Sequence, residues 1–196
     1  MSQSARHDRQ HDVRAGLVCA EAFQRLSEPL ISGIAQGVSE GRQDLSAGFG
    51  DVVASAANLA FALELYLKTL LAQRDLPVPK HHDLRKLYDQ VPIPDKEQIQ
   101  ERYDTVWRSA WNGKRASIVF AKGPPDCPIW DDYREKQKDL PHVLERACDG
   151  FQSWRYIWEY STPPDTHYQR HEFEYGLLLS ACVAVRARIM DGFSND

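Results

Sequence analysis

The sequence is poor in the residues that build disulfide frameworks, zinc sites and phosphate-binding loops. Its four cysteines are widely scattered and form no CxxC pair. We therefore expect reduced, mostly buried thiols rather than a disulfide framework or a zinc site. No glycine loop that would cradle a phosphate stands out, and no Ser/His/Asp nucleophile arrangement does either. The cysteines are Cys19, Cys127, Cys148 and Cys182.

Few histidines and carboxylates occur at the spacing typical of metal ligands. His167 and His171 are four residues apart with Glu174 nearby, which could suit one face of a metal site. An exposed polar first turn of a helix explains these three residues better. His81 and His82 are adjacent, but no carboxylate cluster at ligand spacing accompanies them. The sequence predicts neither a metal nor a cofactor.

Excess positive charge is absent, and so is an apolar signal core near the N-terminus. The net charge of -4 argues against a broadly basic surface that grips nucleic acid through phosphates alone. The net charge still allows a local basic patch, for example in a dimer groove.

The only membrane candidate, Val52–Gln73, contains Glu64 and Lys68, which would each cost about 2.5–3.5 kcal/mol in a bilayer. We expect a cytoplasmic protein that does not enter a membrane.

The segment Val52–Gln73 is the strongest structural signal in the chain. Alanine and leucine dominate it, and neither proline nor glycine interrupts it, so it is predicted to be a helix. Apolar residues cover most of its circumference, which is typical of the central helix of an all-helical domain. Glu64 falls within an apolar stripe, and a carboxylate there needs a cation or hydrogen-bond donors. Lys68, one turn later, can supply one of them.

The rest of the chain is predicted to form one all-α domain over residues 13–192, preceded by a flexible tail over residues 1–12. We expect an irregular loop insertion near residues 114–130, in which the segment 116–120 has a strand-like composition. That loop would be either a lid or partner contact, or a tolerated surface insertion. The expected helices cover residues 13–26, 52–73, 82–88, 95–112 and 139–160, with a poorer helix within 29–50 and a final helix of about 25 residues after residue 165. Leu17, Ala20 and Leu26 lie near one face of the first helix. Asp95 suits an N-cap, and Asp139 with Pro141 in the first turn indicates the start of the helix 139–160.

A second acid–base pair accompanies the first. Arg155 and Glu159 are one turn apart on the predicted helix 139–160. If this helix packs antiparallel to the central helix, the two pairs could form one mutually satisfied cluster. The cluster is then either a buried ion network that fixes helix register, or the polar wall of a cleft for a nucleotide or RNA. In the second case Arg155 would bind phosphate, and His82 would act as acid or base.

Three motifs occur in a set order: Asn58…Glu64-Leu-x-x-Lys68-x-Leu-Leu, His82-Asp-Leu-x-x-Leu87 and Trp154-Arg-Tyr-x-x-Glu159. Together they resemble a group of prokaryotic HEPN proteins (higher eukaryotes and prokaryotes nucleotide-binding domain) over roughly residues 50 to 190. The resemblance implies a HEPN-like helical bundle with a long antiparallel helix pair at its centre, and a homodimer with a groove between protomers. The residues that would line a ligand site or form a buried polar network are Glu64, Lys68, Asp83, Tyr156 and Glu159.

Active HEPN ribonucleases carry Arg-x4–6-His on a late helix, and they need no metal because the 2′-hydroxyl of RNA is the nucleophile. This chain departs from that pattern, because no histidine follows Arg155 within seven residues. The spacing Arg74-x6-His81 does occur, but across a loop with two prolines. The resemblance therefore implies a module of a prokaryotic defence, toxin–antitoxin or stress system that binds RNA, a nucleotide or a protein partner. The alternative is a metal-independent endoribonuclease that cleaves single-stranded RNA, with His82 and Arg155 as candidate catalytic residues.

Overall fold

The structure is a computed structural model that describes residues 11–28, 45–111, 118–122, 138–148 and 169–194. A helix over residues 11–28, here called the N-terminal helix, is followed by five further helices among the described residues. Strands β1 (Ile118–Lys122) and β2 (Gln169–Phe173) pair antiparallel, with Ile118 opposite Phe173. The expected all-α class is confirmed, and the short two-stranded sheet adds to it. The helices are α2 (Leu45–Gln73), α3 (Leu84–Asp89), α4 (Ile93–Trp111), α5 (Leu140–Arg146) and α7 (Tyr175–Ser194).

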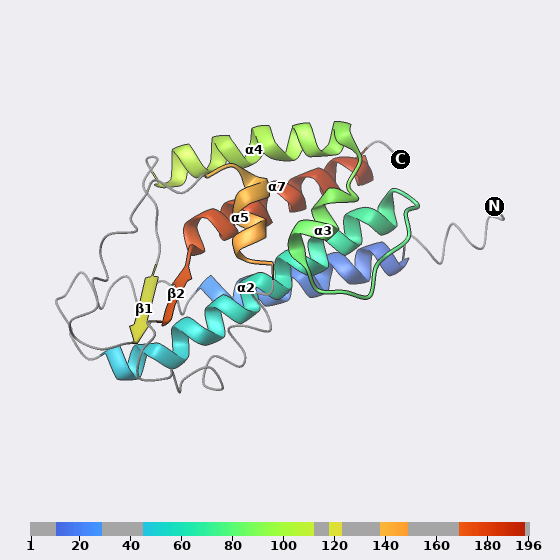
Figure 1. Cartoon of the computed structure of the whole chain (residues 1–196). Coiled ribbons are helices and arrows are strands. Elements are labelled where there is room, and N and C mark those ends of the chain that lie inside the picture. Colours follow the sequence, from blue (N-terminus) through green and yellow to red (C-terminus); the bar gives the residue numbers. More distant parts are fainter. Residues whose placement is uncertain (1–10, 29–44, 112–117, 123–137, 149–168, 195–196) are drawn as a thin grey trace.

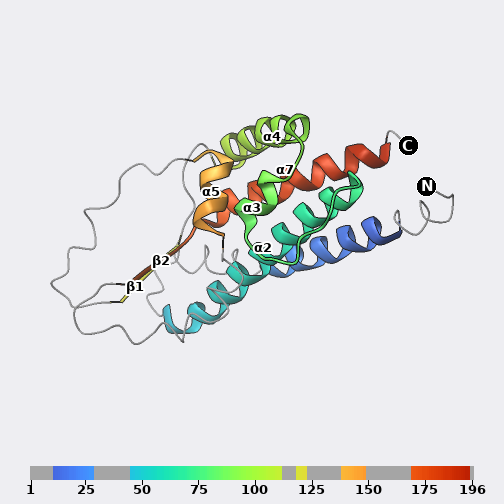
Figure 2. The same cartoon turned by 45° about the vertical axis from the view of Figure 1, so that its right-hand side comes forward.

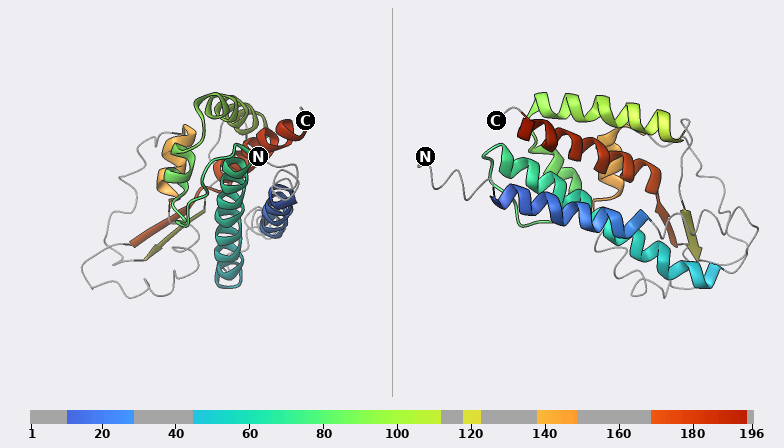
Figure 3. Two further views of the ribbon diagram at one scale, coloured as in Figure 1. Left: turned by 90° about the vertical axis from the view of Figure 1, so that its right-hand side faces the viewer. Right: turned by 180° about the vertical axis from the view of Figure 1, so that it is seen from behind.

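Helix α2 lies at the centre of the helical domain. The N-terminal helix runs along one side of it and α7 along another, while α4 packs against α7 as an outer layer (Figure 1; Figure 3). The short helices α3 and α5 contact each other and attach to α2 and α7, respectively. The β1–β2 pair projects from one end of the domain (Figure 2). By length and composition alone α2 could also cross a membrane, yet more than half of its most apolar window is buried in this fold.

The neighbours of α2 run in opposite directions along it. Ser55 Oγ donates to the Ser27 carbonyl at 2.8 Å, and a Cβ on Gly16 would come 2.5 Å from Thr69 Oγ1, so the N-terminal helix is antiparallel to α2 and needs glycine at this close approach. Helix α7 is parallel to α2, because Cys182 approaches the Leu59 carbonyl at the middle of α2, whereas the Ile189 carbonyl accepts a hydrogen bond from Gln73 at its end. Helix α4 runs antiparallel to α7 (Figure 1).

The core forms where α2 meets α7. Leucines on nearly every side of α2 are fully buried, as its apolar circumference predicts. Alanines at the contact, among them Ala56, Ala181 and Ala184, are also fully buried and let the two backbones approach closely. Each buried leucine contributes about 1.5–3 kcal/mol relative to an exposed one. The fully buried leucines of α2 are Leu59, Leu63, Leu67, Leu70 and Leu71.

Several predicted boundaries need correction. Helix α5 begins as expected, with Asp139 as N-cap and Pro141 in the first turn, but it ends at Arg146 with Ala147 as C-cap. One continuous helix over residues 139–160 is therefore wrong, and residues 149–168 lie outside the described part. The final helix begins at Tyr175 rather than near residue 166, because residues 169–173 pair as strand β2 with β1. Pairing between residues far apart in sequence carries no local signal.

Two further expectations differ in detail. In the N-terminal helix Leu17 and Ala20 are buried as predicted, but Leu26 is 57% exposed. This helix already includes His11 and Asp12, and the rest of the expected tail, residues 1–10, lies outside the described residues. The strand-like composition of residues 116–120 is confirmed by β1, while most of the loop 114–130 lies outside the described residues.

Candidate functional site

The sequence after α2 folds back along it and carries His82 to the carboxylate of Glu64 (Figure 1). Helix α2 ends in a Schellman motif, in which Leu76 N–H donates to the Leu71 carbonyl and Asp75 N–H to that of Ala72. Asp75 occupies the left-handed position at φ 60°. Leu76 packs against the core, which fixes the exit angle of the loop. Pro77 and Pro79 then restrict the backbone of the loop and exclude further helix there.

Glu64 is the buried centre of this site. Its side chain is 2% exposed, and Lys68 Nζ lies 2.7 Å from its Oε1. His82 Nδ1 lies 2.9 Å from Oε1 and 3.1 Å from Oε2. Because a carboxylate only accepts hydrogen bonds, Nδ1 carries the proton in this contact. The His82 side chain is 44% exposed, so a buried acid orients an imidazole that solvent can reach.

Asp83, the residue after His82, has a structural role. It is the N-cap of α3, and its Oδ1 accepts a hydrogen bond from Lys86 N–H at 3.0 Å. Partial burial acts to raise the pKa of Asp83, but hydrogen bonds from the Lys86 backbone and ammonium outweigh it and hold that pKa below its ordinary value. The cap fixes the start of α3 two residues after His82 and so limits where the imidazole can lie.

The structure thus brings Glu64, Lys68 and His82 together, with Asp83 beside them. The other predicted members of the polar network, Arg155, Tyr156 and Glu159, lie outside the described residues. Their part in the site stays a prediction.

Asp95 forms a second buried polar centre, which sequence reasoning placed wrongly. It was expected to cap a helix beginning there, but α4 begins at Ile93, and Asp95 lies in the first turn at 3% exposure. Arg74 binds both of its oxygens, at 2.8 and 3.0 Å, and Arg188 binds Oδ1 at 2.6 Å. Burial raises the pKa of Asp95, but the two guanidinium groups outweigh it, so the pKa stays below its usual range.

The Asp95 network engages Arg74, the arginine of the Arg74-x6-His81 spacing. The Arg74 guanidinium is directed into a bidentate pair with Asp95 that ties the end of α2 to the start of α4. A structural pair of this kind explains Arg74 without catalysis. In the sequence, the only sign of this network is Asp95 near the start of a helix. That position does not predict that Arg74 and Arg188, from distant segments, bind it.

Glu174 also has a structural partner. Arg146 Nε lies 2.8 Å from its Oε2 and Nη2 lies 3.2 Å from its Oε1, and Glu174 is almost fully buried. His171 lies in strand β2 and His167 outside the described residues, so the helical spacing that suggested one metal face does not exist. Within the described ranges no group of three or more His, Cys, Asp or Glu residues comes together.

Comparison with known proteins covers part of the chain. No curated protein and no solved structure matches it. The family model of the HEPN domain matches residues 38–114, a segment that contains α2, the loop after it, α3 and α4, and with them Glu64, Lys68, His82 and Asp83.

Proposed function

We propose that this protein is a HEPN module that binds RNA or a nucleotide through the surface around His82. The observation that carries the proposal is a half-exposed imidazole held by a buried carboxylate within the segment that matches the HEPN domain. An imidazole held in one orientation can contact a phosphate group without losing much side-chain entropy on binding. The match to the HEPN domain, a nucleotide-binding and ribonuclease-like module, supports this class of ligand.

The charge around His82 supports a phosphate ligand. Residues 80–86 contain Lys80, Arg85 and Lys86 but only one acid, Asp83, in a chain whose net charge is -4. Lys80 is exposed and the Lys86 side chain is 71% exposed. Lys86 pairs with Asp83 and Arg85 with Asp89, so a phosphate bound here would compete with these carboxylates for the cations that attract it.

Binding without rapid cleavage fits the sequence better than catalysis. Helix α7 carries Arg186 and Arg188, and no histidine follows either of them in the chain. The Arg-x4–6-His pair of active HEPN ribonucleases is therefore missing from this late helix. We further propose that the protein forms a homodimer and acts in the cytoplasm, in a prokaryotic defence, toxin–antitoxin or stress system, where a cognate protein partner is an alternative ligand.

A second candidate function, metal-independent cleavage of single-stranded RNA, is favoured by the Glu64–His82 pair. A carboxylate on Nδ1 holds the imidazole in one tautomer and one orientation, as general acid–base catalysis requires. Arg155 would then supply the positive charge for the phosphate. Cleavage would require Arg155 to lie near His82.

Fluorescence anisotropy with a labelled single-stranded RNA tests the proposed function. Lys80→Gln combined with Lys86→Gln should weaken binding by about tenfold and lower the salt dependence by about two released ions. Arg108→Gln, at an exposed arginine of α4, is the matched control and should change the affinity little. Equal losses in the two variants, or none, would mean that RNA does not bind at the His82 surface.

A further inference from the structure

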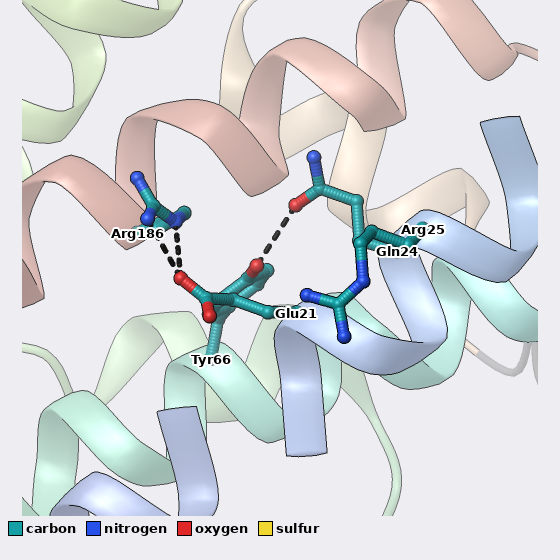
Figure 4. Close-up of a pocket in the computed structure, with 5 residues that line it drawn as sticks. All are labelled: Glu21, Gln24, Arg25, Tyr66 and Arg186. Atoms are coloured by element: carbon teal, nitrogen blue, oxygen red, sulfur yellow. Dashed lines mark hydrogen bonds and ion pairs between the residues drawn. The ribbon is translucent and has the colours of Figure 1, made fainter. Parts of the chain in front are cut away.

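A polar hollow of about 240 Å³ lies between the N-terminal helix, α2 and α7. Three of its lining residues come from the N-terminal helix, one from α2 and one from α7 (Figure 4). Most of the surrounding α2 surface is leucine and alanine, so a polar lining here is a departure from the local pattern. The lining residues are Glu21, Gln24, Arg25, Tyr66 and Arg186.

Tyr66 lies at the inner side of this hollow. Its side chain is fully buried, and its hydroxyl donates to Gln24 Oε1 at 2.8 Å. Burial raises the pKa of Tyr66 well above its ordinary value, and the nearby carboxylate of Glu21 adds to this effect. The hydroxyl therefore stays neutral, and its oxygen keeps the capacity to accept a hydrogen bond.

The walls of the hollow carry opposite charges. Arg186 Nε and Nη2 both lie 2.7 Å from Glu21 Oε1, which leaves Glu21 Oε2 able to accept a further hydrogen bond. Within the part of the chain that the structure describes, the exposed guanidinium of Arg25 has no hydrogen-bond or ion-pair partner. Two guanidinium groups against one carboxylate give the lining a net charge of +1, which suits an anion.

We propose that this hollow binds one ribonucleotide unit. Arg25 would bind the phosphate, since guanidinium groups match phosphate oxygens bidentately. Glu21 would accept from a ribose hydroxyl, as acidic residues do in dinucleotide-binding folds. Gln24, whose side-chain oxygen the buried Tyr66 hydroxyl holds in place, would contact a remaining polar atom. The volume is below the range of pockets for drug-sized ligands, so it suits a single sugar phosphate unit rather than a dinucleotide.

This site is separate from the His82 surface. Tyr66 follows Glu64 by two residues, which is about 200° around a helix, so the two face opposite sides of α2. The ligand class is shared with the proposed function, but no residue is shared. Either site can therefore be absent while the other is present.

Isothermal titration calorimetry with adenosine monophosphate tests the hollow. The wild-type protein should bind it, and Arg25→Gln should weaken binding by about ten- to a hundredfold, because a hydrogen bond between charged groups is lost. Tyr66→Phe should weaken it severalfold while removing a single oxygen atom. The 2′,3′-dideoxy analogue should bind more weakly to the wild type, because it lacks the hydroxyls for Glu21. Arg108→Gln is again the control, and thermal melting checks that each variant is folded.

A single-stranded RNA hexamer distinguishes the two sources of a ribonucleotide unit. Competition between the hexamer and the mononucleotide, lost in Arg25→Gln, would assign the hollow to a nucleotide within a strand. Binding of the mononucleotide without such competition would assign it to a free nucleotide. Absence of binding by both probes at millimolar concentration would overturn the proposal. A loss seen with Lys80→Gln and Lys86→Gln but not with Arg25→Gln would also overturn it, while leaving the His82 surface in place.

Discussion

Replacement of Lys68 by methionine should destabilise the protein far more than replacement of Glu64 by leucine. Lys68→Met keeps most of the aliphatic stem but removes the ammonium 2.7 Å from a carboxylate that is 2% exposed. His82 remains as a partner of Glu64. We therefore expect a loss of about 3 kcal/mol in the free energy of unfolding, at the low end of the range for breaking a buried pair.

Glu64→Leu removes the buried charge itself. Lys68 is already 18% exposed and His82 44% exposed, so both can turn to water, and the expected loss is below about 1 kcal/mol. The double variant should resemble Glu64→Leu alone, which gives a coupling energy of about 3 kcal/mol, the full cost of Lys68→Met. Urea denaturation followed by circular dichroism measures all three differences. Lys86→Met, at an exposed pair with Asp83, is the control and should cost about 0–1 kcal/mol. Equal, small losses in both single variants would refute the reasoning, because Glu64 would then be solvated.

Asp95→Asn should cost about 3 kcal/mol at pH 7, because it leaves two arginines without their carboxylate. The pKa of Asp95 is lowered in the folded state, so the stability that its carboxylate contributes is present above the ordinary aspartate pKa and disappears as the pH falls through the folded value. Urea denaturation at pH 7 and below pH 4 should show that the difference in free energy of unfolding between wild type and variant shrinks at low pH. Asp75→Gly should raise the free energy of unfolding by about 0.5–1 kcal/mol, because Asp75 has a φ of 60° that glycine adopts without strain; an unchanged or lower melting temperature would contradict the Schellman geometry. Purified protein should cleave single-stranded RNA slowly or not at all in EDTA, and any cleavage should fall in both His82→Ala and Arg155→Ala; gel assays in which neither variant matters would remove both residues from the chemistry. Sedimentation velocity at tens of micromolar should show a dimer, and monomer alone would rule out a groove shared between protomers.

Local patterns predicted the helices with strong periodic or capping signals. The apolar circumference of residues 52–73 predicted a buried central helix, and Leu59, Leu63 and Leu67 are fully buried in it. The start of α5 followed from Asp139 and Pro141. These signals succeed because capping and helical periodicity act between residues at most a few positions apart.

The polar centres were only partly predictable. The i,i+4 spacing of Glu64 and Lys68 predicted their pair, since neighbouring turns of a helix hold such residues together. The pair of Arg74 with Asp95 and that of Glu21 with Arg186 had no comparable signal. In each, the partners belong to segments far apart in the sequence, and their encounter depends on how the helices pack.

By itself the sequence determined that this chain forms a helical domain around one apolar helix, and that Glu64 would need a cation within that helix. The tertiary structure alone decided that His82 reaches Glu64, that Asp95 and not a loop histidine receives Arg74, and that Tyr66 meets Gln24 beside an ion pair. Burial and capping depend on residue type and local spacing, whereas each of these contacts depends on the direction in which one backbone segment passes another. That direction follows from core packing summed over the whole domain, which no single motif encodes.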